Sequence, residues 1–244
     1  MPYVQHAFGR LARALLRRRG FDVVPYAPFG PDASELVALL DRLGVDCVLD
    51  VGAFTGTYGR MLRGLGYRGR IVSFEPASEN FAALAREAGG DSGWSVRRVG
   101  IGSVAGTMEL QLSGSAGSNS FLAANDYALR EMPRTFGRRG VEPVEVTTVD
   151  EVFGESAGDS GSVFLKVDTQ GYDLEVLRGA SDSLRRIAAL QVELALQPTY
   201  EGQPGYAEIL DEVGRYGFSP ALLHPTYRDS AGRIVECDCV FIPA

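Results

Sequence analysis

The chain has few of the residues that would place it in several large classes of proteins. Its 244 residues include three cysteines, two histidines and one tryptophan. No run approaches the roughly 20 apolar residues that a membrane-spanning helix needs, so we expect no stable membrane insertion. An odd number of cysteines without zinc-like spacing argues against a disulfide framework or a zinc site and indicates a reducing compartment. Arginines interrupt and follow the apolar stretch near the N-terminus, which is unlike a signal peptide, and we therefore expect a cytoplasmic protein.

Positive charge is also scarce. There are 24 lysines and arginines against 31 aspartates and glutamates, which gives a formal net charge of −7. Such an acidic surface disfavours nucleic acid as a partner. The one basic cluster lies at residues 10–19, on a helix predicted over residues 4–19. That helix packs either on its own domain or on a second copy in a homodimer, and the sequence leaves both open.

What the chain does contain is an alternation of strands and helices. Short apolar runs predict strands at residues 47–51, 71–74, 95–99, 163–167, 187–194, 218–223 and 237–242, with helical patterns between most of them. A polar turn at residues 228–232 makes the last two strands antiparallel. The order predicts an α/β fold with a mostly parallel sheet. We expect one catalytic domain over residues 45–244, preceded by a helical segment over residues 1–44.

The first predicted strand leads into a turn bracketed by Gly52 and Gly56. Glycines let a ligand approach the backbone, but these do not spell the G-x-G-x-x-G fingerprint of a dinucleotide site, and no P-loop lysine follows. The second strand ends in Glu75, where a carboxylate can accept hydrogen bonds from a ribose diol. Asp50, just before the glycines, would repel a phosphate and attract an ammonium group. The pattern therefore favours S-adenosylmethionine, which has an amine and a ribose but no phosphate, over a nicotinamide dinucleotide.

Three residues are candidates for the chemical step because ligands of open α/β sheets bind at the carboxyl ends of the strands. Asp168 follows one buried strand, Glu193 lies in the next, and His224 follows a third. Each has a side chain that can take a proton from an alcohol. The alternatives are structural: an ion pair of Asp168 with Lys166, a helix cap, or packing of the histidine. Asp168, Asp173 and Glu193 could together hold a divalent cation, but their spacing is not a metal motif, and we expect no metal.

The segment at residues 113–140 breaks the alternation. Residues 113–119 are small and polar, and residues 122–140 mix helix-compatible positions with Pro133. Connections of this length are usually functional or disordered. We expect a lid or an insertion that faces the acceptor, with a disordered linker as the alternative.

Several of these stretches together resemble the FkbM family of S-adenosylmethionine-dependent O-methyltransferases. The matching stretches are Asp50-Val51-Gly52-Ala53 with Gly56, Phe74-Glu75-Pro76 with Phe81, Gly100-Ile101-Gly102 with Gly106, Thr148-Val149-Asp150, Leu165-Lys166-Val167-Asp168-Thr169-Gln170-Gly171-Tyr172-Asp173, Val176-Leu177-Arg178-Gly179-Ala180, and Glu193. The resemblance covers about residues 45–243. It implies a class I methyltransferase Rossmann-like fold, with a seven-stranded sheet, one antiparallel strand and helices on both faces. It also implies methyl transfer to a hydroxyl group of a small natural product or saccharide.

The resemblance implies a set of cofactor-binding residues as well. They are Asp50, Gly52, Ala53, Phe54, Thr55, Gly56, Glu75, Pro76, Ile101 and Asp168. The chain departs from the family at Phe54, where Asn is usual, and at Gln170 or Asp173, where Glu is common. The departure at Phe54 supports an alternative function, a non-catalytic partner subunit that keeps the fold. An NAD-dependent oxidoreductase is a further alternative, but the chain lacks its Tyr-x-x-x-Lys pair.

Overall fold

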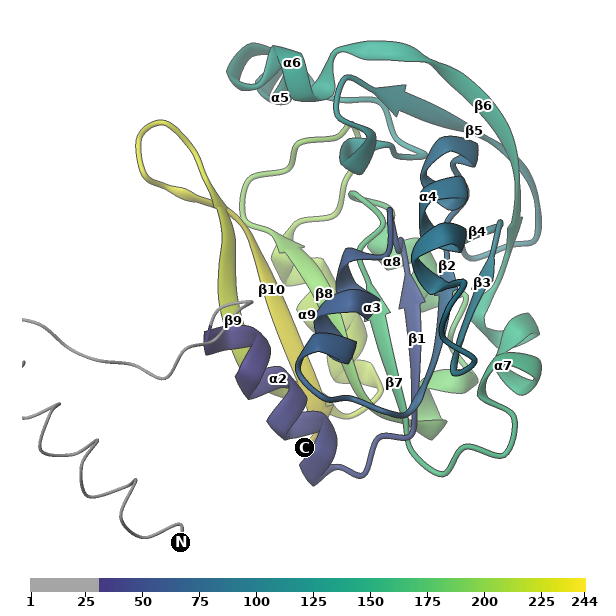
Figure 1. The fold of residues 1–244 in the computed structure, drawn as a ribbon. Helices are drawn as coiled ribbons and strands as arrows, with labels where there is room; N and C mark the ends of the chain where they lie inside the picture. The colour runs from purple at the N-terminus through teal and green to yellow at the C-terminus, as the bar shows by residue number, and fades with distance from the viewer. Residues whose placement is uncertain (1–30) are drawn as a thin grey trace, which may run out of the picture.

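The computed structural model describes residues 31–244 (Figure 1). The helix predicted over residues 4–19, with its basic cluster, lies outside the described residues. The first described element is helix α2, Pro31–Arg42. Among the described residues, no helix is both long enough and apolar enough to cross a membrane.

A seven-stranded sheet forms the centre of the molecule (Figure 1). Its strands are β1 (Cys47–Val51), β2 (Arg70–Phe74), β3 (Trp94–Arg97), β7 (Val163–Val167), β8 (Ile187–Ala195), β9 (Phe218–Arg228) and β10 (Ile234–Pro243). The spatial order is β3-β2-β1-β7-β8-β10-β9. Strand β10 is antiparallel to both of its neighbours, and the other pairs are parallel. The predicted seven-stranded, mostly parallel sheet with one antiparallel strand is confirmed.

The central strands β1 and β7 are buried along their whole length. Strands buried on both faces read as continuous apolar runs, and both of these do so except at Asp50 and Lys166. These two residues are direct partners in the register of the β1–β7 pair. Their side chains form an ion pair with 3.3 Å between the Lys166 Nζ and Asp50 Oδ1 atoms. The two breaks in the apolar pattern therefore compensate each other.

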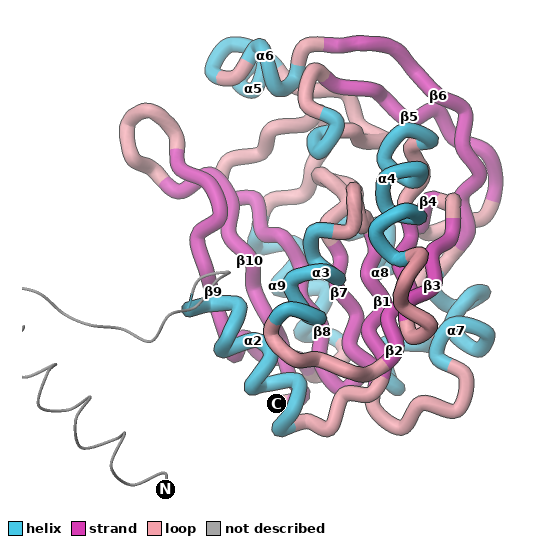
Figure 2. The backbone as a smooth tube through the Cα atoms, in the orientation of Figure 1, coloured by secondary structure: helices cyan, strands magenta, loops and turns pink. Residues whose placement is uncertain are grey.

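Helices cover both faces of the sheet (Figure 2). Helices α2, α3 (Thr57–Gly64) and α4 (Ser78–Ala88) contribute Leu36, Leu62 and Leu84 to one apolar cluster. The opposite cluster takes side chains from α7 (Val149–Ala157), α8 (Asp173–Arg178) and α9 (Tyr206–Arg215), and the short helix η2 (Ser183–Arg186) adds Leu184 to it. Cys47, Cys237 and Cys239 are free thiols buried in this second cluster. Helices therefore cover both faces of the sheet. The carboxyl ends of the strands are where ligands of such sheets bind.

A smaller sheet follows the third strand of the main one. It has the order β4-β6-β5, from β4 (Gly100–Ile101), β5 (Gly106–Ser113) and β6 (Arg138–Thr147). Between β5 and β6 lie the short helices η1 (Ala116–Ser118), α5 (Asp126–Glu131) and α6 (Pro133–Phe136). Asn125 caps α5 through a hydrogen bond from the Ala128 amide. Residues 113–140 are therefore folded, and the disordered-linker alternative is wrong.

The C-terminal hairpin is longer than predicted. The sequence places the end of its first strand at residue 223, but β9 continues to Arg228. Pro225 made the predicted strand end early, because proline usually ends a strand. Strand β9 is the edge strand of the sheet, where a proline need not break a hydrogen bond between strands. His224 therefore lies inside β9. The expectation that it follows the strand is wrong.

Candidate active site

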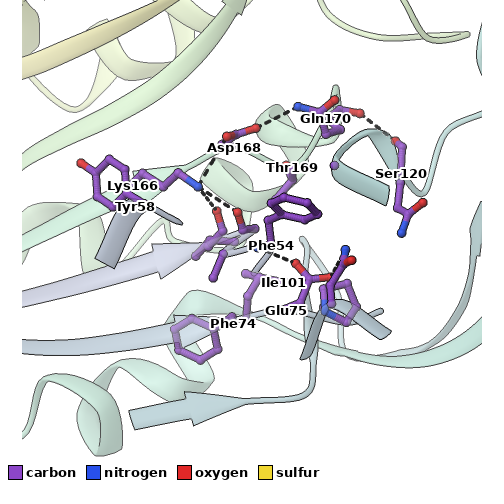
Figure 3. A pocket seen from close by; sticks show the side chains of 18 of the residues that line it. Phe54, Tyr58, Phe74, Glu75, Ile101, Ser120, Lys166, Asp168, Thr169 and Gln170 are labelled. Carbon is purple, nitrogen blue, oxygen red and sulfur yellow. Dashed lines mark hydrogen bonds and ion pairs between the residues drawn. The ribbon is translucent and has the colours of Figure 1, made fainter. Parts of the chain in front are cut away.

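A cavity of about 360 Å³ opens at the carboxyl ends of β1, β2 and β7 (Figure 3); we call it the first cavity. The predicted cofactor residues that line it are Gly52, Ala53, Phe54, Glu75, Pro76, Ile101 and Asp168. Three others, Asp50, Thr55 and Gly56, do not line it. The structure therefore brings most of the predicted set to one hollow, at the edge where α/β sheets bind their ligands.

The turn after β1 has an unusual backbone. Gly52, Phe54 and Gly56 all have positive φ angles, of 75°, 52° and 86°. A β-carbon at Gly52 would lie 1.8 Å from the carbonyl oxygen of Asp168, so the glycine is required by the end of β7. A bulky residue with positive φ is strained, whereas Asn adopts this conformation more readily. Phe54 therefore adopts a backbone conformation that suits Asn, the usual residue at this position in the FkbM family, better than it suits Phe.

Glu75 is fixed by hydrogen bonds from three groups. Its carboxylate accepts from the amide of Phe54 at 2.9 Å, the amide of Ala77 at 3.0 Å and the side chain of Asn80 at 3.3 Å. The residue is 5% exposed. Burial raises its pKa to about 7, although these hydrogen bonds act in the opposite direction. The Glu75 carboxylate is thus a preformed hydrogen-bond acceptor beside the glycine turn. Two backbone amides and one side chain set its orientation.

Lys166 occupies the other end of the first cavity and was not predicted as a site residue. Its ammonium lies 3.3 Å from Asp50, 3.5 Å from Asp168 and 2.9 Å from the carbonyl oxygen of Gly52. Burial lowers the pKa of Lys166, but the carboxylates of Asp168 and Asp50 raise it by more, so the net shift is upward. Asp50 is fully buried and also accepts a hydrogen bond from Ser73 at 2.8 Å. The charge that was expected to face a ligand ammonium is therefore already paired with a lysine.

The loop after β7 links Asp168 to Glu193. The side-chain amide of Gln170 donates to Asp168 at 3.0 Å and to Glu193 at 3.4 Å. Glu193 does not line the first cavity. Burial raises its pKa well above the ordinary value, and the charge of Asp168 adds to the rise. Asp173 accepts hydrogen bonds from the amides of Thr169 and Gly171 within this loop, so its carboxylate stabilises the turn.

His224 lies apart from the first cavity. It lines a second cavity of about 240 Å³, next to helix α2; we call this the second cavity. In the register of the sheet, Asp238 of β10 is the direct partner of both Glu193 and His224. Partners in adjacent strands point to the same face, so these three side chains form a row across β8, β10 and β9.

Asp238 is a second site residue that was not predicted from the sequence. It lines both cavities. The available signal was its position between Cys237 and Cys239, because the two thiols point into the apolar cluster and the residue between them must face the other side of the strand. Among the described residues, no group of three or more histidine, cysteine or acidic side chains is placed to hold a metal ion.

The predicted lid contributes to the first cavity. Its residues Ala116, Gly117, Asn119, Ser120 and Phe121 line that cavity, and none of residues 113–140 lines the second one. The hydroxyl of Ser120 donates to the Gln170 carbonyl oxygen at 2.7 Å. The segment is thus docked against the loop after β7, and whether it opens and closes stays a prediction.

Comparison with known proteins gives one family. Residues 50–220 match the family model described as Methyltransferase FkbM domain. No curated protein sequence matches the chain. Among solved structures, magnesium protoporphyrin IX methyltransferase from Synechocystis PCC 6803 with bound SAM is similar at 12% identity, with 87% of this chain and 78% of that chain covered and a TM-score of 0.48. A TehB-like SAM-dependent methyltransferase from Corynebacterium glutamicum is similar at 11% identity, with 100% of both chains covered and a TM-score of 0.43.

Proposed function

The chain belongs to the FkbM methyltransferase family, and we propose that it transfers the methyl group of S-adenosylmethionine to a hydroxyl group of a small acceptor. The observation that carries the proposal is the carboxylate of Glu75, held by three hydrogen-bond donors at the end of β2 beside the glycine turn. A carboxylate fixed in this way accepts hydrogen bonds from the two hydroxyls of a ribose.

The lining of the first cavity fits the methyl donor in three parts. Four apolar side chains that suit an adenine ring are part of the lining: Val99, Ile101, Leu110 and Phe121. Glu75 suits the ribose. At the other end, Asp168 offers an acidic group to the positively charged methionine portion. The three parts follow one another along the ends of the strands.

The same lining disfavours a phosphate-bearing cofactor. Among the lining residues, Lys166 is the only lysine or arginine. Its ammonium is already engaged by two carboxylates and two backbone carbonyl groups. A pyrophosphate would therefore meet carboxylates without a free cation, which is unfavourable. This argues against the NAD-dependent oxidoreductase, which also lacks its sequence fingerprint.

S-adenosylmethionine supplies a methyl group already activated by a positive sulfur. The protein then has to hold the donor and the acceptor oxygen in line, and such positioning lowers the barrier by several kcal/mol. The loop after β7, fixed by Gln170 and Asp173, places Asp168 for this purpose. We propose Asp168 as the residue that orients the donor, with Glu193 and His224 near the acceptor.

The alternative of a non-catalytic partner subunit rests on Phe54. The side chain that Asn would supply is absent, but the backbone amide of Phe54 still binds Glu75 at 2.9 Å. This hydrogen bond supports a turn that keeps its backbone contacts to the cofactor without Asn at this position. We propose an active enzyme on this ground.

The acceptor is proposed to be a natural product or a saccharide with a free hydroxyl. An acidic chain is a poor partner for nucleic acid. Three free, buried cysteines agree with a reducing, cytoplasmic location. A homodimer through the N-terminal segment is part of the same proposal.

The proposed function is tested with S-adenosylmethionine that has an isotopically labelled methyl group. We expect hydroxylated natural products or sugars offered as acceptors to gain one labelled methyl group on oxygen. Asp168→Asn is expected to fold and to bind adenosylhomocysteine but to lose most turnover. Two results together would favour the partner-subunit alternative. The wild type would bind the cofactor without methylating any acceptor, and Asp168→Asn would bind the cofactor as the wild type does.

A further inference from the structure

The second cavity adjoins the first. The two cavities have Tyr58, Met61, Gln191 and Asp238 in common as lining residues. The remaining lining of the second cavity is mostly apolar and comes from α2, β9 and β10: Ala33, Leu36, His224, Pro225, Thr226 and Val240. A hollow of about 240 Å³ exceeds the 150 Å³ of an engineered cavity that binds benzene. One substituted ring therefore fits in the space.

Polar groups gather where the two cavities meet. The hydroxyl of Tyr58 donates to the side-chain oxygen of Gln191 at 2.8 Å. Gln191 in turn hydrogen-bonds to Asp238. The carboxylate of Asp238 thus lies beside Gln191 and in the lining of both cavities.

From this arrangement we propose that the second cavity binds the methyl acceptor, a hydroxylated ring with an apolar face, and that Asp238 receives the proton of its hydroxyl. The inference rests on the proposed function of the first cavity. The acceptor oxygen attacks the methyl carbon with its lone pair, the bond between that carbon and sulfur breaks, and its electrons remain on sulfur. The hydroxyl proton passes to the Asp238 carboxylate. The products are a methyl ether, adenosylhomocysteine and a protonated aspartate.

The surroundings of Asp238 suit this role. Burial raises its pKa to about 6, and the charge of Asp168 contributes, while Lys166, the hydrogen bond from Gln191 and the charge of His224 act in the opposite direction. Glu193 is its direct register partner on β8, and its carboxyl group lies on the same face of the sheet. A base with a pKa near the working pH combines the correct protonation state with sufficient basicity.

The test uses phenol as the acceptor probe and anisole, in which the hydroxyl is methylated, as its matched control. The chain has four methionines, and Met61 lines both cavities. Its ¹³C-methyl signal in NMR, assigned with Met61→Leu, therefore reports ligands in either one without requiring turnover. Adenosylhomocysteine is added to saturation first, and phenol, anisole or methyl α-D-glucoside is titrated afterwards.

We expect phenol to shift the Met61 signal in the adenosylhomocysteine complex and to bind about tenfold more tightly than anisole, as for a hydrogen bond to a charged group. Asp238→Ala should remove this preference. Asp238→Asn, which keeps the shape, should reduce it. Glu236→Gln is the control, because Glu236 lies two residues away on the same strand but lines neither cavity, and it should keep the preference. Raising the pH through about 6 should increase the preference in the wild type, as the carboxylate forms.

Each result separates the two proposals. A wild type that does not bind adenosylhomocysteine overturns the proposed function. A wild type that binds adenosylhomocysteine but not phenol, or that binds phenol and anisole equally, overturns the acceptor site alone. Tighter binding of methyl α-D-glucoside than of phenol overturns the ring with an apolar face as the acceptor class. A full preference for phenol in both Asp238 variants, each with normal adenosylhomocysteine affinity, overturns the role of Asp238.

Discussion

The two ends of the first cavity are built in different ways. At the end that we propose binds the ribose, called here the ribose end, Glu75 is held by Phe54, Ala77 and Asn80, which all lie within a short stretch of chain around the first two strands. At the other end, which we propose for methyl transfer and call the transfer end, side chains come from β7, β8 and β10, and β10 is far from the other two in the sequence. The first end depends on backbone amides, and the second depends on the register of the sheet.

The difference extends to electrostatics. At the ribose end, one carboxylate faces only hydrogen-bond donors. At the other end, the carboxylates of Asp50 and Asp168 share a single cation, Lys166, and further acids lie beyond it. At the ribose end, several local hydrogen bonds hold Glu75 in place. At the transfer end, one lysine compensates two carboxylates. Substitutions at the two ends should therefore have different consequences for stability.

The largest effect is expected from Lys166→Met. It leaves the fully buried Asp50 without a cation, and breaking a buried ion pair costs about 3–5 kcal/mol of unfolding free energy. The double variant Lys166→Met with Asp50→Asn should recover much of the loss, since no buried charge remains unpaired. Urea unfolding followed by circular dichroism measures both. A loss below about 1 kcal/mol in the single variant would show that the pair is well solvated.

Gly52→Val probes the point where the two ends meet. The new β-carbon would overlap the carbonyl oxygen of Asp168, and a branched residue would be strained at this φ angle, so we expect a loss of about 3 kcal/mol or more. Gly44→Val is the matched control, because Gly44 also has a positive φ but has no atoms within 4 Å of a β-carbon. The control should lose only the conformational part, about 1–3 kcal/mol. Equal losses in the two variants would remove the close contact as the cause.

Stability should also depend on pH through the ribose end. Glu75 has a pKa of about 7 in the folded protein, against an ordinary value of 4.5. Between these values the folded state binds more protons than the unfolded state, so unfolding free energy falls as the pH rises. We expect the ligand-free wild type to lose stability between pH ~4.5 and ~7.5, and Glu75→Gln to lose less over the same range. Identical slopes would mean that Glu75 does not titrate in this window.

The smallest effect is expected at the segment that covers the first cavity. The hydroxyl of Tyr200 lies 3.1 Å from the Ser118 carbonyl oxygen and donates to Gln170 at 2.9 Å. Tyr200→Phe should lower stability by about 1 kcal/mol, the usual contribution of one hydrogen bond, and should speed proteolysis within residues 113–140. Tyr206→Phe is a control on an exposed tyrosine. Unchanged proteolysis would show that other contacts hold the segment in place.

The same comparison explains which features could be predicted from the sequence. The ribose end could be predicted because Gly52 and Glu75 belong to one βαβ unit, whose geometry follows from a short local pattern. Most of the sheet could also be predicted, because its central strands β1 and β7 are apolar runs broken at a single position each. The end of β9 could not, because Pro225 is a stop signal in a central strand but not at an edge.

The transfer end was harder to predict because it depends on register between distant strands. Asp50 is adjacent to the glycine turn in sequence, yet the β1–β7 register pairs it with Lys166. Asp238 joins Glu193 and His224 only through the pairing of β10 with both neighbours. Its position between two buried cysteines indicates only which face of the strand it lies on, and the pairings are needed to show which side chains lie beside it.

The most direct test of the proposed cofactor site is calorimetric titration of S-adenosylmethionine, adenosylhomocysteine and NAD⁺ into the wild type and Glu75→Ala. We expect the wild type to bind the first two with one site per chain and not to bind NAD⁺. We further expect Glu75→Ala to weaken the binding of both by about 1–3 kcal/mol, as for the loss of a charged hydrogen bond. Binding of NAD⁺, or unchanged affinity for S-adenosylmethionine in a folded Glu75→Ala variant, would contradict the proposed cofactor site.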